Sequence, residues 1–210
     1  MEAKFWRDKW ASNQIGFHSD EFHPMLVQHW HSLEMDPSAT VFVPLCGKSV
    51  DMVWLRARGH DVVGVELSEI AAAAFFDENK VTAERFNTGP FRCYRGGGYT
   101  ILCGDLFELK LGHISHINCV YDRASLIALP PETRQSYAAH LASLCASGTM
   151  MLLVTLNYPA DEVSPPPFLV GDDEVDTLYS SWCDVTNIGT DAAEIKGVKG
   201  RETAFRLCVS

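Results

Sequence analysis

The sequence predicts an α/β fold: a mostly parallel sheet of seven strands, with helices on both faces and an antiparallel hairpin at its C-terminal end. Short apolar segments alternate with segments of helical periodicity along the 210 residues, a pattern typical of parallel strands covered by helices. The two last apolar segments, 183–188 and 203–209, read as an antiparallel pair at the sheet edge. We expect the Gly- and Lys-rich stretch between them, near 190–200, to be a mobile turn.

The first third of the chain predicts two buried strands and three helices. A helix opens at Ser19 or Asp20 with Pro24 in its early turns. The strands are Thr40–Leu45 and DVVGVE at 61–66, and Gly59 ends the helix between them. Ser68 is the expected N-cap of a helix that includes AAAAFF. Apolar residues at helical spacing mark the first two helices: Phe22, Met25, Leu26, Trp30 and Leu33, then Val50, Val53, Trp54 and Ala57.

The remainder continues the alternation. FRCYRGGGYTILCGD reads as a hairpin around Gly96–Gly98. INCVYD at 117–122 and TMMLLVTL at 149–156 are core strands, and the helix between them opens at Pro130 and Pro131. A proline-rich loop containing SPPPF follows, and then a short helix with Val175, Leu178, Tyr179 and Trp182 on its apolar side.

Composition limits the partners. A formal charge of −10 argues against a nucleic-acid or anionic-membrane partner, since both need concentrated Lys and Arg. The N-terminus MEAKFWRDKW has no apolar signal core, and the seven cysteines form no C-x-x-C pair, so we expect a cytoplasmic protein with reduced thiols. The histidine pairs lack further ligands at zinc spacing, so no metal is expected. No exposed apolar helix stripe stands out, and we expect a monomer.

The turn after the first strand, VFVPLCGKSVDM, resembles half of a phosphate-binding loop. A P-loop needs G-x-x-x-x-G-K-[ST], and the position five residues before Gly47 is Phe42. The first glycine is therefore missing, and nucleotide triphosphate hydrolysis is disfavoured.

A nucleoside site at the carboxyl ends of the strands explains more of the pattern. The bend Leu45-Cys46-Gly47 follows a buried strand, and its one glycine lets a ligand approach the backbone closely. Nineteen residues later Glu66 ends the second strand, where an acidic side chain accepts hydrogen bonds from ribose hydroxyls. Asp105-Leu106 ends the third segment, beside the expected adenine. The alternative for Glu66 is an ordinary exposed residue that opens a turn.

The number of glycines separates two ligand classes. Dinucleotide enzymes use three glycines to admit a pyrophosphate, and only one is present here. S-adenosylmethionine, which has ribose and adenine without pyrophosphate, fits better than NAD. The predicted sheet also suits the Rossmann-like class I methyltransferases by analogy of fold.

The sequence resembles the bacterial type of the thiopurine S-methyltransferase family. The resemblance implies a single domain over 1–210, in which 1–35 forms a helical lid segment. It implies transfer of a methyl group from S-adenosylmethionine to the sulfur of aromatic and heterocyclic thiols such as thiopurines, and a link to selenium and tellurium detoxification. The matching stretches are FWRDKWASNQIGFH (5–18), VPLCGKSVDMVWL (43–55), GHDVVGVELSE (59–69), YDRASLIALPP (121–131) and PPPF (165–168).

The resemblance also implies site residues. Phe17 matches a position against the acceptor, and Phe168 of the proline loop is a further acceptor candidate, because loops carry recognition. The segment before the last strand departs from the family pattern, so no substrate-contacting residue is transferred there. The cofactor positions are Trp6, Trp10, Leu45, Glu66, Asp105, Leu106 and Arg123.

The donor is an activated sulfonium, so we expect catalysis by positioning and assign no catalytic acid or base. Structural roles compete with two assignments: Trp6 and Trp10 have the spacing of a packed helix face, and an Asp122–Arg123 pair is suited to cap the next helix. Two other functions remain open. They are a non-catalytic nucleoside-binding module of the same fold and an NAD oxidoreductase.

Overall fold

The computed structural model describes residues 3–114 and 116–210. The chain divides into two compact units. The first comprises Met1–His23 and Asp36–Ile117, and the second comprises Pro24–Met35 and Asn118–Ser210. The predicted lid segment 1–35 is thus shared between the two units, and the single domain over 1–210 stays a prediction.

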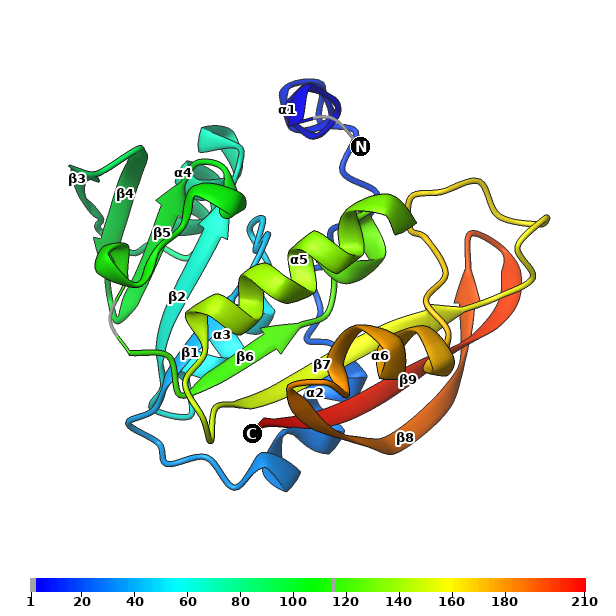
Figure 1. Ribbon diagram of the computed structural model, residues 1–210. Coiled ribbons are helices and arrows are strands. Elements are labelled where there is room, and N and C mark those ends of the chain that lie inside the picture. Colours follow the sequence, from blue (N-terminus) through cyan, green and yellow to red (C-terminus); the bar gives the residue numbers. More distant parts are fainter. Residues whose placement is uncertain (1–2, 115) are drawn as a thin grey trace. The chain divides into compact units, whose positions relative to one another are not determined.

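The first unit contains a five-stranded sheet in the order β3-β4-β5-β2-β1 (Figure 1). β1, β2 and β5 are parallel, whereas β3 and β4 are antiparallel additions at the edge beyond β5. The near-continuous Val and Ile content of the parallel strands agrees with their burial on both faces. The strands are β1 (Thr40–Val43), β2 (Asp61–Glu66), β3 (Glu84–Thr88), β4 (Phe91–Gly96) and β5 (Tyr99–Cys103).

The helices of the first unit follow their sequence signals. Ser68 caps α4, because its side chain accepts a hydrogen bond from the Ala71 N–H at 3.4 Å. Gly59, with φ +102°, follows the end of α3 in the left-handed region. α4 packs against β2 and β5, and α1 packs on α4. The helices are α1 (Ala3–Ala11), α3 (Asp51–Arg56) and α4 (Glu69–Glu78), with short 3₁₀ turns η2 (Leu106–Glu108) and η3 (Leu111–His113).

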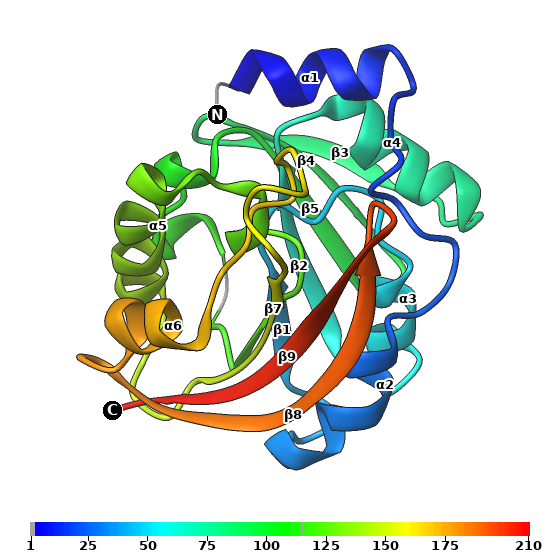
Figure 2. The same cartoon turned by 90° about the vertical axis from the view of Figure 1, so that its right-hand side faces the viewer.

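The second unit contains a four-stranded sheet in the order β6-β7-β9-β8. β6 and β7 are parallel, and the long β8–β9 hairpin adds antiparallel to β7 (Figure 2). α5 lies along one face of β6 and β7, whereas α2 and η1 contact β7 from the other side (Figure 1). The elements are β6 (Cys119–Asp122), β7 (Met150–Asn157), β8 (Cys183–Ile195), β9 (Val198–Val209), α2 (Pro24–His29), η1 (Trp30–Leu33), η4 (Leu126–Ala128), α5 (Pro131–Leu144) and α6 (Asp172–Tyr179).

The Rossmann-like α/β class is confirmed, with three corrections. The described residues form nine strands rather than seven, because β3 was not recognised and the 91–105 hairpin contributes two. α2 begins at Pro24 and not at Ser19, and Phe22 is 47% exposed outside it. The expected turn near 190–200 is instead a continuation of β8 and β9, whose tip lies at Lys196–Gly197.

None of the helices in the described ranges combines the length and the apolar content that crossing a bilayer requires.

Candidate functional site

The bend after β1 has the backbone conformation that the single glycine predicts. Leu45 and Gly47 have positive φ values of +44° and +54°, and the Cys46 N–H donates to the Val65 carbonyl at 2.9 Å. A Cβ at position 47 would lie 3.1 Å from the Trp10 ring. Glycine is therefore favoured at this position by its backbone angle and by the close approach of Trp10.

Glu66 at the end of β2 joins this bend to the next turn. One carboxylate oxygen accepts a hydrogen bond from the Gly47 N–H at 2.8 Å, and the other accepts from the Ser68 N–H at 2.7 Å. The residue is only 5% exposed, so its reading as an ordinary exposed turn residue is wrong. The predicted meeting of this carboxylate with the 45–47 bend is confirmed.

Burial governs the protonation of this carboxyl group. Desolvation raises the pKa of Glu66 from 4.5 to about 7, against hydrogen bonds from the Ser68, Gly47 and Leu67 N–H groups that lower it. A carboxylate has about four acceptor positions, so the backbone donors leave capacity for a hydroxyl group.

This pKa predicts opposite pH effects on ligand affinity and stability. Affinity for a ribose ligand is expected to fall about tenfold between about pH 8 and about pH 6, as the carboxylate protonates. The folded-state pKa lies above the unfolded value, so this group stabilises the ligand-free fold below the unfolded pKa, and its contribution is lost as the pH rises through about 7. Calorimetric titration with S-adenosylhomocysteine checks this, with Glu66→Gln as the variant that should lose the pH dependence. Constant wild-type affinity across this range would contradict it.

Three aromatic side chains of the N-terminal segment gather beside the bend. Phe17 packs edge-on to Trp6 and to Trp10, each with ring centroids 5.5 Å apart. Trp10 is 7% exposed, whereas Phe17 is 44% exposed. Trp10 therefore packs within the unit as the structural alternative expected, and it also touches the glycine of the bend.

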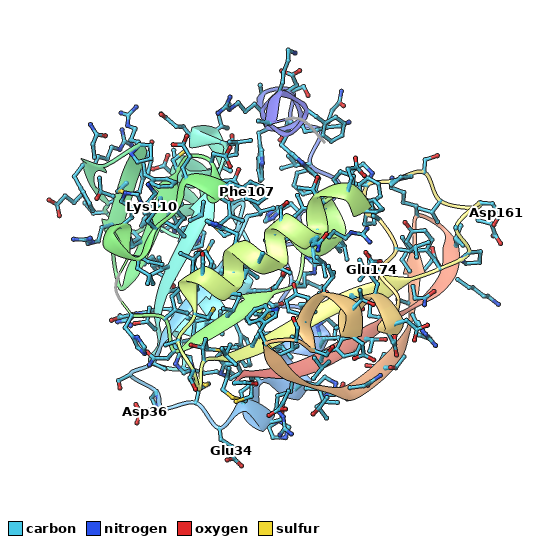
Figure 3. All side chains as sticks on the ribbon, in the orientation of Figure 1. Glu34, Asp36, Phe107, Lys110, Asp161 and Glu174 are labelled. Carbon is cyan, nitrogen blue, oxygen red and sulfur yellow. The ribbon has the colours of Figure 1, made fainter. Side chains whose placement is uncertain are left out.

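The turn after β5 presents Asp105 and Leu106 differently. Asp105 is exposed, and its carboxylate accepts the Phe107 N–H at 3.0 Å as the cap of η2. Leu106 is 3% exposed and faces the core, whereas Phe107 is 42% exposed (labelled in Figure 3). Phe107 is thus a further apolar surface on this turn. It was not predicted, because a run of LFEL does not reveal which residue faces outward.

In the second unit, Asp122 and Arg123 have separate roles at the end of β6. The fully buried Asp122 carboxylate accepts hydrogen bonds from the Tyr137 hydroxyl at 2.6 Å and from the Ser125 and Leu126 N–H groups at 3.1 and 3.2 Å. Within residues 3–114 and 116–210, the half-buried Arg123 has neither a hydrogen bond nor an ion pair. The proposed Asp122–Arg123 cap is therefore wrong, because Asp122 caps the turn alone.

Phe168 lies half-buried in the wall of a cavity of about 350 Å³. Its N–H donates to the Ile127 carbonyl at 2.7 Å, and the Arg134 guanidinium lies 5.7 Å from its ring centroid. Arg134 is 1% exposed and donates to both carboxylate oxygens of Glu174 at 2.7 Å. In the first unit, a cavity of about 380 Å³ between α4 and β3 is lined by none of the predicted site residues.

The first-unit residues fit an adenosyl group. A buried carboxylate with spare acceptor capacity, a bend that exposes backbone, and the turn after β5 meet at the carboxyl ends of parallel strands, where ligands of this fold class bind. No group of three or more His, Cys, Asp or Glu side chains in the described part of the chain is arranged to hold a metal ion.

Comparison with known proteins gives consistent matches. A family model described as thiopurine S-methyltransferase matches residues 1–206. A thiopurine S-methyltransferase of Pseudomonas aeruginosa (strain UCBPP-PA14) is 47% identical over 86% of this chain and 83% of its own length. One of Marinobacter nauticus is 46% identical over 90% and 86%. The structure of a magnesium protoporphyrin IX methyltransferase from Synechocystis PCC 6803 with bound SAH is similar in fold, with a TM-score of 0.67, 14% identity and full coverage of both chains.

Proposed function

The chain belongs to the thiopurine S-methyltransferase family and is an S-adenosylmethionine-dependent methyltransferase, and from this premise we propose that it methylates the sulfur of aromatic and heterocyclic thiols. Thiopurines are the model acceptors, and selenium or tellurium species are a secondary class. The observation that carries the proposal is the buried Glu66 carboxylate bonded to the Gly47 N–H at 2.8 Å, which sets a ribose-binding group at a backbone bend.

The cofactor supplies an activated methyl group on a cationic sulfur. Glu66 holds the ribose, and the bend at Leu45 lines the same edge. Trp10 and Trp6, which both pack edge-on to Phe17, offer aromatic faces that favour nearby positive charge. Asp105 borders the adenine, and the buried Leu106 supports the same turn from the core side. Arg123 has no partner in the described chain, so its guanidinium is available for the methionine carboxylate or an anionic acceptor.

The acceptor requires positioning rather than acid–base catalysis. Aromatic thiols are partly ionised near neutral pH, so the sulfur attacks without a dedicated base. The protein must hold it at about 3–3.5 Å from the methyl carbon, in line with the departing sulfur and away from water. We assign binding of the acceptor to Phe17 and Phe168. We further propose a cytoplasmic monomer without nucleic-acid or membrane partners.

The proposal is tested by methyl transfer from labelled S-adenosylmethionine to a panel of thiopurines, thiophenols, selenite and tellurite. We expect labelled thioethers from the aromatic thiols. The competing possibility is a nucleoside-binding module that retains the cofactor site without a competent acceptor pocket. Cofactor binding without transfer to any acceptor would favour that module and overturn the proposal.

A further inference from the structure

The proline loop, residues 159–168, contains a run of three prolines that donates no backbone hydrogen bonds. Pro165, Pro166 and Pro167 have no N–H groups, so this run cannot form a ladder of backbone hydrogen bonds. Its carbonyl groups still require donors wherever water is excluded. Side chains of other segments can therefore contact this run through its carbonyl groups, which accept hydrogen bonds.

Two side chains outside the proline run supply these donors. The Lys196 ammonium donates to the Ser164 carbonyl at 2.8 Å and to the Pro166 carbonyl at 2.7 Å. The Tyr158 hydroxyl donates to the Pro167 carbonyl at 2.5 Å. Three carbonyl groups between residues 164 and 167 are therefore held by side chains that lie outside the proline run.

Lys196 lies in the turn of a hairpin, in a backbone conformation that is uncommon for lysine. It lies at the tip of the β8–β9 hairpin with φ +51°, next to Gly197 with φ +84°. The hairpin carries the tip to the segment that follows β7, as Figure 1 shows. A lysine in the left-handed region is unfavourable relative to glycine or asparagine. The backbone turn alone therefore does not account for a lysine here, whereas its contact with the loop does.

The loop leads directly into Phe168. The Phe168 N–H donates to the Ile127 carbonyl, and the Val170 N–H donates to the Leu156 carbonyl, both at 2.7 Å. The backbone that Lys196 holds is thus continuous with the residue that we assign to the acceptor. The Phe168–Ile127 hydrogen bond is thus the next backbone contact after the run that Lys196 holds, and a shift of that run would strain it.

We propose that Lys196 is a positioning residue that holds the proline loop in the conformation required for recognition of the thiol acceptor. This inference rests on the proposed function and extends it to the hairpin segment 190–202, for which the family resemblance implied no residue. Lys199 makes neither of these contacts, and Arg201 lies 3.6 Å from Asp172 in an ion pair. Lys196 alone of the three binds the loop.

The test compares Lys196→Ala, Lys196→Arg and Lys199→Ala in the full-length protein. Lys199→Ala removes the same charge from the same hairpin and is the matched control. For Lys196→Ala we expect kcat/KM for a thiophenol acceptor to fall about tenfold at saturating cofactor, since two charge-assisted hydrogen bonds are lost. Amide exchange at Phe168 should quicken, whereas the Kd of S-adenosylhomocysteine should not change. Lys196→Arg retains donors and should recover part of the activity.

The possible outcomes distinguish failure of the positioning role of Lys196 from failure of the proposed thiol methylation. A wild-type protein that methylates no thiol refutes the proposed function, whatever the exchange data show. An active wild type with unchanged kcat/KM in Lys196→Ala overturns the positioning role. Equal losses in Lys196→Ala and Lys199→Ala also overturn it, because the effect would then be one of net charge.

Discussion

Glu66→Ala is expected to weaken the binding of S-adenosylmethionine about a hundredfold, because hydrogen bonds of the two ribose hydroxyls to a carboxylate contribute about 3 kcal/mol together. The same substitution removes the acceptor of the Gly47 and Ser68 N–H groups at the bend. We therefore also expect the free energy of unfolding to fall by about 2 kcal/mol, since unsatisfied buried donors are costly.

This stability effect follows from the burial of the Glu66 side chain, which is 5% exposed. Part of this loss of stability is offset, because burial of the Glu66 charge is itself unfavourable. The same burial raises the pKa of Glu66 to about 7, and alanine has no charge to desolvate. Val65→Ala is the control: it truncates a neighbouring side chain that is 0% exposed, and so it lowers stability without removing the ribose acceptor. Calorimetry below the unfolding temperature should show normal affinity for Val65→Ala. Unchanged affinity in Glu66→Ala would refute the ribose assignment.

Asp122→Ala is expected to lower the free energy of unfolding by about 3 kcal/mol, which is the second large effect. The substitution leaves the buried Tyr137 hydroxyl and the N–H groups of Ser125 and Leu126 without their acceptor. Burial raises the pKa of Asp122, and these donors lower it. Chemical denaturation followed by tryptophan fluorescence measures the change.

Arg123→Ala is the matched substitution at the next position. Arg123 has no hydrogen bond or ion pair among the described residues, so its removal should leave the free energy of unfolding within about 0.5 kcal/mol of the wild type. If its guanidinium binds the cofactor or acceptor, kcat/KM should fall at least about tenfold. A stability loss comparable to that of Asp122→Ala, with normal turnover, would return Arg123 to a purely structural role.

Much of the architecture was predictable because its signals are local. Four predicted features match the structure: the strand 61–66, the Ser68 cap, the hairpin around Gly96–Gly98, and the helix after Pro130 and Pro131, which begins at Pro131. β3 was missed because its sequence, ERFNT, has only one large apolar residue and no alternation that predicts a strand. The hairpin segment 190–200 was misread as a turn, since its Gly and Lys content outweighs its weak strand pattern while pairing with β9 stabilises it.

In the candidate site, too, some features were predictable from the sequence and others were not. The spacing between Gly47 and Glu66 was sufficient to predict that they meet, because the carboxyl ends of adjacent parallel strands share one edge of a sheet. The contact of Trp10 with Gly47, the burial of Leu106 and the exposure of Phe107 were not predictable from these positions.

By itself the sequence determined the α/β class, the family, and the strand-end carboxylate beside a one-glycine bend. Those features depend on periodicity, turn residues and motif spacing, which are properties of short stretches of chain. Only the tertiary structure decided that Asp122 rather than Arg123 caps the turn after β6, and that Lys196 binds the carbonyls of Ser164 and Pro166. The physical reason is that hydrogen-bond partners and burial depend on which distant segments the fold brings together, and the number of donors near a group is set by that packing.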